Sequence, residues 1–389
     1  MHRSSRYPCL LSVLIGGVAF GQATQTAPAQ DSSQAPATSA PAAPAPTPPP
    51  SAWTKEGIDF YLLGDVYGDL NFNHPDSGYN QLYNFNERAN EVHLNMAKFS
   101  MERAPAPIGF RVDLGIGQTF DTISATDPGP DGMKYLEQVY VEFKPSQLHG
   151  IQLDFGKFVT SAGAEVIETN TNWNYSRSLL FALAIPYYHM GLRATIPVNK
   201  IFTTGVQVVN GWNDVDIADG NFGKTVGIIG NFAWKKVSWS NTYYTGRFKF
   251  GLLDSYRQVY DTVLLLNPND KASVYLNFDY GSDKPNGLLR SNWTGFAAAA
   301  RYQLTKRFAV SPRAEIFDDM DGFSTGNPQT VKEVTVTGEM KIKDYLLGRL
   351  EFRRDNSDHP YFDRGTGLEV AKAQTTMTLG LVAFFGPKK

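Results

Sequence analysis

The stretch "IDFYLLGDVYGDLNF", residues 58–72, alternates between apolar and polar side chains along nearly its whole length. One parity is apolar, with glycines in two places: Ile58, Phe60, Leu62, Val66, Leu70 and Phe72. The other parity is polar, with Leu63 as its exception: Asp59, Tyr61, Asp65, Tyr67, Asp69 and Asn71. A period of two indicates a β-strand, because successive side chains of a strand point to opposite faces of a sheet. Strands in soluble domains usually have about 5–6 residues, so a strand this long implies an apolar environment along one entire face.

The same alternation recurs along the chain, for example in "IGFRVDLGIGQTF" (108–120), "KASVYLNFDY" (271–280) and "FAVSPRAEIF" (308–317). The connections between these stretches alternate in length. Short connections fall at 103–107, 145–150, 197–200, 235–236, 267–270, 305–306 and 341–344. Longer polar connections fall near 73–89, 121–134, 160–187, 210–223, 248–254, 282–291, 318–329 and 355–369. This rhythm predicts an all-β fold, a transmembrane antiparallel up-and-down barrel of about sixteen strands within a range of fourteen to eighteen, whereas a Greek-key sandwich would mix the lengths.

The N-terminal residues are predicted to lie outside the barrel. Residues 1–21 have a basic start and the apolar run "CLLSVLIGGVAF", which is typical of a secretory signal peptide cleaved after Gly21 or Ala23. Residues 22–52 are rich in Pro and Ala and predict a disordered linker, which leaves 53–389 for the barrel. The single cysteine, Cys9, lies in the signal peptide, so the mature chain has no disulfide or cysteine-based zinc site. Export without disulfides favours a bacterial envelope protein.

Charge and aromatic residues agree with this interpretation. The formal net charge is only −2, which excludes the strongly basic surface that nucleic-acid binding needs. Aromatic side chains near strand ends predict the interfacial girdles of a membrane barrel, with ordinary cross-strand pairs as the alternative. These residues are Trp234, Trp239, Tyr243, Tyr244, Trp293, Tyr345, Phe384 and Phe385.

Charged side chains on the polar parity are predicted to line a water-filled lumen. They are Asp65, Asp69, Arg111, Asp113, Arg193, Arg301, Arg313, Glu315, Arg349, Glu351 and Arg353. Opposed rows of charge give a transverse electric field across the lumen, which disfavours apolar solutes. The guanidinium groups of the arginines could also bind solutes that carry phosphate or carboxylate groups. The alternative is that these charges only hydrate the lumen and pair across strands.

One region resembles a known family. The segments "NYSRSLLF" (174–181), "IPYYHMGLR" (185–193) and "VVNGWND" (208–214) are similar to the OmpL-like β-barrel porin family of bacterial outer membranes. The resemblance is sharpest over 155–214 and extends over 58–389, and it implies a porin-like barrel. It departs from outer-membrane barrels at the C-terminus, where Phe385 is followed by "GPKK", and this departure leaves open how the assembly machinery reads the last strand.

The connection 160–187 is the third long loop and is partly apolar, so it is predicted to fold into the lumen. Ser176 or Ser178 is expected to cap a short helix that Pro186 terminates. By analogy with general porins, whose third loop narrows the pore, Glu165, Glu168 and Arg177 are then expected in a constriction. The alternative places this loop on the outer rim or at a subunit interface.

The resulting hypothesis is an outer-membrane porin for passive diffusion of small hydrophilic solutes or ions, not an enzyme, with no cofactor, catalytic residue or metal. Its expected partners are outer-membrane lipid, the solutes and the assembly machinery, and a homo-oligomer is expected from porins in general. One alternative is a non-conducting barrel whose loops bind a partner or surface polymer. Another is a rim-sited hydrolase, which requires His93 or His189 to meet a serine and a carboxylate; the sequence has neither GxSxG nor HExxH.

Overall fold

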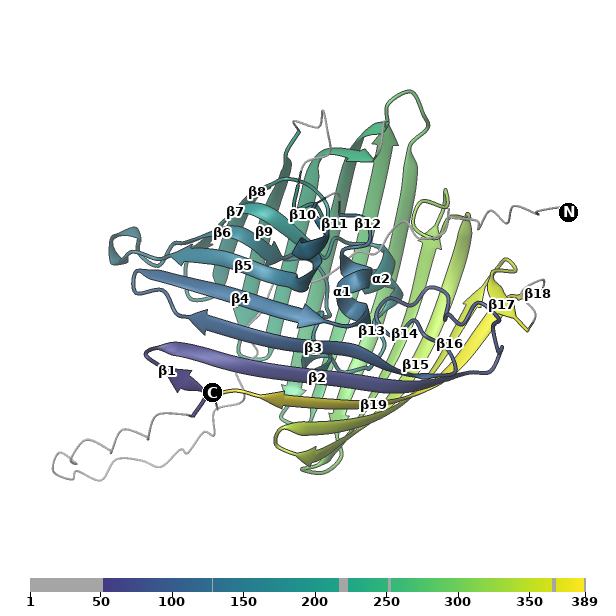
Figure 1. Ribbon diagram of the computed structural model, residues 1–389. Helices are drawn as coiled ribbons and strands as arrows, with labels where there is room; N and C mark the ends of the chain where they lie inside the picture. Colours follow the sequence, from purple (N-terminus) through teal and green to yellow (C-terminus); the bar gives the residue numbers. More distant parts are fainter. Residues whose placement is uncertain (1–51, 128, 217–222, 251–252, 366–368, 388–389) are drawn as a thin grey trace, which may run out of the picture.

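In the computed structural model, the described residues are 52–127, 129–216, 223–250, 253–365 and 369–387. Their main sheet has 17 strands; apart from the two-residue β1, the strands pair antiparallel in chain order and close into a ring of sixteen (Figure 1). The ring closes because the last strand, β19, pairs with β2. The predicted all-β up-and-down barrel of sixteen strands is confirmed. The predicted signal peptide and nearly all of the predicted linker lie outside the described residues.

The strands of the ring are β2 (Ile58–Asn71), β3 (Val92–Arg103), β4 (Ile108–Ile116), β5 (Leu136–Phe143), β6 (Gln152–Val159), β7 (Tyr188–Pro197), β8 (Phe202–Val209), β9 (Thr225–Trp234), β10 (Val237–Phe250), β11 (Leu253–Asn269), β12 (Ala272–Pro285), β13 (Ser291–Gln303), β14 (Phe308–Asp319), β15 (Gln329–Lys343), β16 (Leu346–Ser357) and β19 (Ala373–Phe385). The smaller elements are β1 (Thr54–Lys55), β17 (Phe362–Arg364), β18 (Glu369–Ala371), α1 (Gln118–Ile123), α2 (Leu179–Leu183) and the 3-10 turns η1 (Asp131–Tyr135), η2 (Ser146–Leu148) and η3 (Thr169–Thr171). No helix among the described residues is long and apolar enough to cross a bilayer.

The connections alternate between tight turns at one end of the barrel and longer loops at the other, with two corrections. The predicted long loop at 248–254 is largely strand, and half of the residues in the predicted long loop at 282–291 are strand. Strands β10 and β11 stay paired as far as Phe250 and Leu253, and β12 stays paired with β13 as far as Asp283 and Ser291. Strands β10 to β13 therefore extend further toward the longer loops than the sequence pattern predicted.

The two parities of β2 have opposite surroundings. Leu62, Val66 and Leu70 are exposed on the outer face, whereas Asp65 and Asp69 are buried on the inner face. Other strands repeat this arrangement, and their exposed apolar side chains form a nearly continuous band around the barrel. The alternation in the sequence therefore separates an apolar outside from a polar inside, as predicted.

The aromatic residues divide between the two faces. Trp234, Trp239 and Tyr345 are exposed on the outside, and the Tyr345 and Phe385 rings stack with centroids 5.0 Å apart. Tyr244 and Trp293 were wrongly predicted to join the girdles, since both are buried inside the barrel. The error is one of parity, because a shift of one position moves a side chain to the opposite face of a strand.

Substitution of Val336 by arginine is expected to destabilise the barrel in lipid vesicles by about 2–4 kcal/mol, the usual cost of a cation on the apolar outer face near the bilayer centre. Val336 is 43% exposed and lies at the middle of the 15-residue β15. Equilibrium unfolding in urea measures the change. Ile108→Arg is the control, since Ile108 is 60% exposed but begins β4 beside a tight turn, where the cost falls to about 0–1 kcal/mol. Equal losses for both variants would contradict a membrane-spanning outer face.

Candidate functional site

The loop between β6 and β7, residues 160–187 and called L3 below, folds into the barrel. Its helix α2 is capped by Ser178, whose hydroxyl oxygen accepts a hydrogen bond from the Phe181 N–H at 2.9 Å, as the sequence predicted. Leu179, Leu180 and Leu183 of α2 are buried in one apolar cluster with inward side chains of β11 to β14. Figure 1 shows α2 within the ring of strands. L3 thus has a core of its own inside the lumen.

The barrel wall has room for L3 because small residues face it. Gly295 on β13 is one such position: a Cβ there would lie 2.7 Å from Cδ1 of Leu180. A Cβ at Gly380 on β19 would overlap the ring of Tyr175. Larger residues at either position would therefore displace L3 from the wall. Trp293 adds a direct bond, since its indole N–H donates to the Ala184 carbonyl oxygen at 3.0 Å.

Three arginines of the inner wall bind the backbone carbonyl oxygens of L3. Arg313 of β14 donates to the Ser176 oxygen at 2.8 Å. Arg349 and Arg353 of β16 donate to the Asn172 and Arg177 oxygens at 2.5 Å and 2.7 Å. Guanidinium groups suit this task because each presents several N–H donors in a fixed plane. The predicted lumen arginines of β14 and β16 are therefore occupied by protein.

Carboxylates of the same wall bind the backbone N–H groups of L3. The two oxygens of Glu351 accept hydrogen bonds from the Tyr175 and Ser176 N–H groups at 2.6 Å and 2.8 Å. Glu315 accepts a longer bond of 3.3 Å from the Leu180 N–H. A loop buried in a barrel must satisfy its polar backbone, and these wall charges do so.

The three residues predicted for a constriction take different places in L3. Arg177 is buried and binds the loop itself, donating to the Val166 and Tyr175 carbonyl oxygens at 2.9 Å and 2.6 Å. Glu165 is also buried, pairing with Arg313 at 2.8 Å and accepting from the Ser178 N–H. Glu168 is partly exposed. All three lie inside the barrel, and their role in a constriction stays a prediction.

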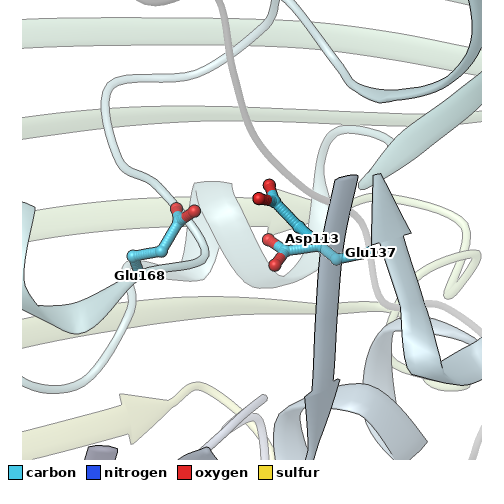
Figure 2. A group of neighbouring side chains, drawn as sticks. All are labelled: Asp113, Glu137 and Glu168. Carbon is cyan, nitrogen blue, oxygen red and sulfur yellow. The ribbon is translucent and has the colours of Figure 1, made fainter. Parts of the chain in front are cut away.

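Glu168 attaches L3 to the wall at Lys98 of β3, which lies three strands from β16 around the ring. The Lys98 ammonium donates to Glu168, to Glu137 at 2.6 Å and to Asp113 at 3.4 Å. Figure 2 shows the Glu168 side chain reaching toward Asp113 and Glu137, which come from the neighbouring strands β4 and β5. Burial would raise the pKa of the Glu168 carboxyl, but attraction to Lys98 outweighs burial and holds that pKa below its ordinary value.

These three carboxylates have oxygens within 4.8 Å of one another, close enough to share a metal ion. The Lys98 ammonium already supplies the positive charge between them, so a metal would have to displace it. Sequence reasoning missed Lys98 and Glu137. The sequence did contain a signal for Lys98. It lies between the apolar Ala97 and Phe99 on a strand with the same alternation, which places its side chain on the polar, inward-facing parity.

The ten residues predicted as lumen-lining, together with Arg353, all lie on inner-face positions, and they form two groups. Arg111, Arg193 and Arg301 keep exposures of 20%, 18% and 28%, toward the end of the barrel with the tight turns. The others are covered by L3 or by neighbouring loops and side chains: Asp65, Asp69, Asp113, Arg313, Glu315, Arg349, Glu351 and Arg353. Contact of any of them with a passing solute stays a prediction.

Each of the three partly exposed arginines has a carboxylate partner on a nearby strand. Arg111 Nη1 lies 2.8 Å from Glu102 Oε2, and Arg193 Nε lies 2.8 Å from Asp154 Oδ2. Arg301 Nη2 lies 2.6 Å from Glu339 Oε1. These pairs form a partly exposed inner surface on which each arginine is matched by a carboxylate.

The two histidines of the hydrolase alternative are not arranged for catalysis. His189 is fully buried and contacts the Gly211 carbonyl oxygen at 2.9 Å and the Thr160 hydroxyl at 3.0 Å. His93 lies 3.5 Å from Glu91. Neither of these contact sets combines a serine with a carboxylate.

Replacing Lys98 by methionine is expected to lower the free energy of unfolding by about 3–5 kcal/mol at pH 7, because buried carboxylates lose their cation. The pKa of Glu168 is lowered in the folded chain, so its contribution is present above the ordinary value of 4.5 and is lost as the pH falls through the lowered pKa. The difference in free energy of unfolding between the wild type and Lys98→Met should therefore be smaller at about pH 3 than at pH 7. Urea unfolding at both pH values measures it.

Lys134→Met is the control for this experiment, since the Lys134 ammonium makes an exposed pair with Asp121 and exposed pairs contribute little. A Lys98→Met barrel as stable as the wild type at pH 7 would contradict the electrostatic role.

Replacing Glu351 by glutamine is expected to loosen L3, because an amide group cannot accept both backbone N–H bonds. The peptide bond after Arg177, buried in the folded protein, should then be cut by trypsin about tenfold faster, as expected for loss of one charge-assisted hydrogen bond of about 1.5 kcal/mol. Mass spectrometry of timed digests measures the cut. Glu102→Gln is the control, because Glu102 is an inner-wall carboxylate paired with Arg111 and not with L3 backbone. Equal rates of trypsin cleavage after Arg177 in both variants would show that Glu351 does not hold L3 in place.

Comparison with known proteins places this geometry in a family. Residues 58–385 match the family described as "Putative beta-barrel porin-2, OmpL-like". A comparison with curated proteins finds no match.

Solved structures share the fold at low sequence identity. OmpT of Vibrio cholerae, in a trimer form, is 10% identical with a TM-score of 0.57, over 84% of this chain and 99% of its own. The anion-selective porin from Comamonas acidovorans is 9% identical with a TM-score of 0.58, over 84% and 99%. The outer membrane channel DcaP of Acinetobacter baumannii is 9% identical with a TM-score of 0.55, over 85% and 99%. The family match covers most of the chain, and the chain therefore belongs to the OmpL-like beta-barrel porin family.

Proposed function

We propose that the protein is an outer-membrane porin through which small hydrophilic solutes or ions diffuse passively, along the space between L3 and the inner wall. The observation that carries this proposal is the set of partly exposed ion pairs around Arg111, Arg193 and Arg301. Charged groups on an inner wall keep it wetted and disfavour apolar solutes. They would have no such use in a barrel filled by protein along its whole length.

L3 sets the size of solute that fits this proposal. It lies inside the barrel as a folded unit with its own apolar core and is bonded to β14, to β16 and to Lys98 of β3. The free cross-section is correspondingly smaller than that of an empty sixteen-strand barrel, which leaves an aqueous channel. The proposed solutes are therefore ions and small polar molecules.

The charges suggest weak ion selectivity. Each partly exposed arginine is matched by a carboxylate within 2.8 Å, so neither sign dominates the hydrated surface. Selectivity follows the dominant sign of charge along a pore, and a balanced wall gives a reversal potential near zero.

Location and assembly are part of the same proposal. The apolar outer face suits a bilayer, and the similar solved structures include proteins described as outer-membrane proteins or channels. In barrels of that membrane the longer loops are extracellular and the tight turns periplasmic. A homo-oligomer is proposed because one similar structure is described as a trimer form.

A second candidate function, a non-conducting barrel whose loops bind a partner, is favoured by the dense packing of L3. The loop between β2 and β3 adds to it: Asn84 donates to the Ala182 carbonyl oxygen at 2.9 Å, and the Phe85 ring packs on Phe181 at 5.6 Å. Two loops therefore meet at the middle of the lumen, where a complete plug would stop conduction.

Single-channel recording in planar bilayers separates the two functions. The wild-type protein is expected to give small ohmic steps with a reversal potential near zero in a salt gradient. A variant in which a Gly-Gly link replaces residues 172–185 should conduct several-fold more, because half of L3, including α2, is removed. Glu351→Gln, which loosens L3 by one side chain, should give intermediate or noisier steps, and heat-modifiable migration in gels verifies that each protein is folded.

The outcomes are distinct. Silence of the folded wild type together with conduction by the loop variant would reject the open porin and support a barrel closed by L3. Silence of both folded proteins would reject any pore along this path and support the binding role.

A further inference from the structure

The outer face of β16, β19, β2 and β3 carries a groove that no internal function explains. Cross-strand register places Leu350, Leu379, Gly68 and Val92 in one row across four strands, β16, β19, β2 and β3. Because Gly68 has no side chain, a shallow groove of about 360 Å³ opens in this row. It is lined mainly by exposed apolar side chains, among them Leu70 and Met377.

The groove leads toward two cations at the end of the barrel with the longer loops. The next row outward contains Phe352, Met377 and Leu70, and the row after that pairs Arg354 with Thr375. Lys332 lies one row further, opposite Asn356. Since two residues of a strand span about 6.7 Å, Arg354 lies roughly 13 Å along the strand from Leu350.

Both cations are exposed, and neither has a carboxylate partner within the part of the chain that the structure describes. Arg354 donates one hydrogen bond, to the Thr375 hydroxyl at 2.8 Å. Lys332 is exposed beside it on the neighbouring strand. Two acidic residues border the groove itself: Asp69, which is buried on the inner face, and Glu91, which lies 3.8 Å from Arg88 and 3.5 Å from His93. Arg354 and Lys332 are therefore exposed cations without an ion pair in the described part of the chain.

A cation directly above an apolar band is unfavourable in a bilayer unless an anion meets it. We propose that this surface binds a phosphorylated, multiply acylated lipid of the outer leaflet, with a phosphate at Arg354 and Lys332 and an acyl chain in the groove over Gly68. An arginine fork matches phosphate oxygens, and cations beside a membrane surface contribute about 1 kcal/mol each. The spacing of the rows places headgroup and chain at the depths that a single lipid requires.

The proposed site rests on the outer-membrane location and on the outward orientation of the longer loops, both part of the proposed function, but it does not require an open lumen. If the barrel binds this lipid but carries no current, the proposed pore function is contradicted and the lipid site is not. A barrel that conducts but does not bind the lipid would contradict the site alone.

Native mass spectrometry of the full chain in detergent tests the proposal with bisphosphorylated lipid A as the probe. The double variant Lys332→Gln/Arg354→Gln is expected to weaken binding about 30-fold, equivalent to about 2 kcal/mol. Gly68→Phe fills the groove and should weaken binding several-fold without changing any charge. Lys306→Gln/Arg307→Gln is the matched control, because it removes the same two charges from a tight turn at the other end of the barrel.

Two further arms identify the part of the lipid that is recognised. Lipid A lacking both phosphates should bind about as weakly to the wild type as the intact lipid binds to the Lys332/Arg354 variant, and inorganic phosphate should compete only at far higher concentration because it lacks the chain. Equal binding of both lipids to the wild type, or an equal loss in the Lys306/Arg307 control, would overturn the proposal. Heat-modifiable migration verifies that every variant is folded.

Discussion

The hydrogen bonds between the first and last strands are the constraint on which the structure depends. Strand β19 pairs with β2 over ten residues of each strand, from Thr376 and Asn71 to Phe385 and Leu62. An open sheet of this size would expose two edges of unpaired N–H and C=O groups, which an apolar membrane interior cannot satisfy. Closure removes both edges, and it also fixes one parity of every strand as inside and the other as outside.

Inside the ring, the charges of the wall act mainly on protein backbone. Arg349, Arg353 and Glu351 of β16 bind carbonyl and N–H groups of L3 that would otherwise be buried without partners. A buried charge is unfavourable unless it is well paired, and its partner is strongly destabilised when it is removed. The same side chains that would hydrate an empty barrel therefore hold a loop in place, whereas the arginine pairs near the tight turns stay partly exposed.

Outside the ring, the apolar parity does not end at the same height on every strand. On β15 and β16 the outward positions change from Val336 and Phe352 to Lys332 and Arg354 within a few residues. In the proposed membrane location, this change would mark the level at which hydrocarbon gives way to charged headgroups, in a region where Gly68 leaves space beside the neighbouring strands. Charged side chains on both faces therefore need partners near apolar surroundings. On the inner face the partners are backbone groups of L3, and on the outer face we propose a lipid phosphate.

The sequence by itself predicted the barrel, about sixteen strands, the two faces of most strands and the length of L3, because all four follow from local periodicity and turn composition. It also narrowed the helix cap to Ser176 or Ser178, and the structure shows Ser178. It did not determine that Trp293 and Tyr244 point inward or that Lys98 joins three carboxylates. Once L3 fills the lumen the inside is no longer uniformly wet, so hydrophobicity no longer indicates which way a side chain points. The partners of Arg313, Arg349 and Arg353 lie more than a hundred residues away along the chain, and only the tertiary structure brings such distant groups within hydrogen-bond distance.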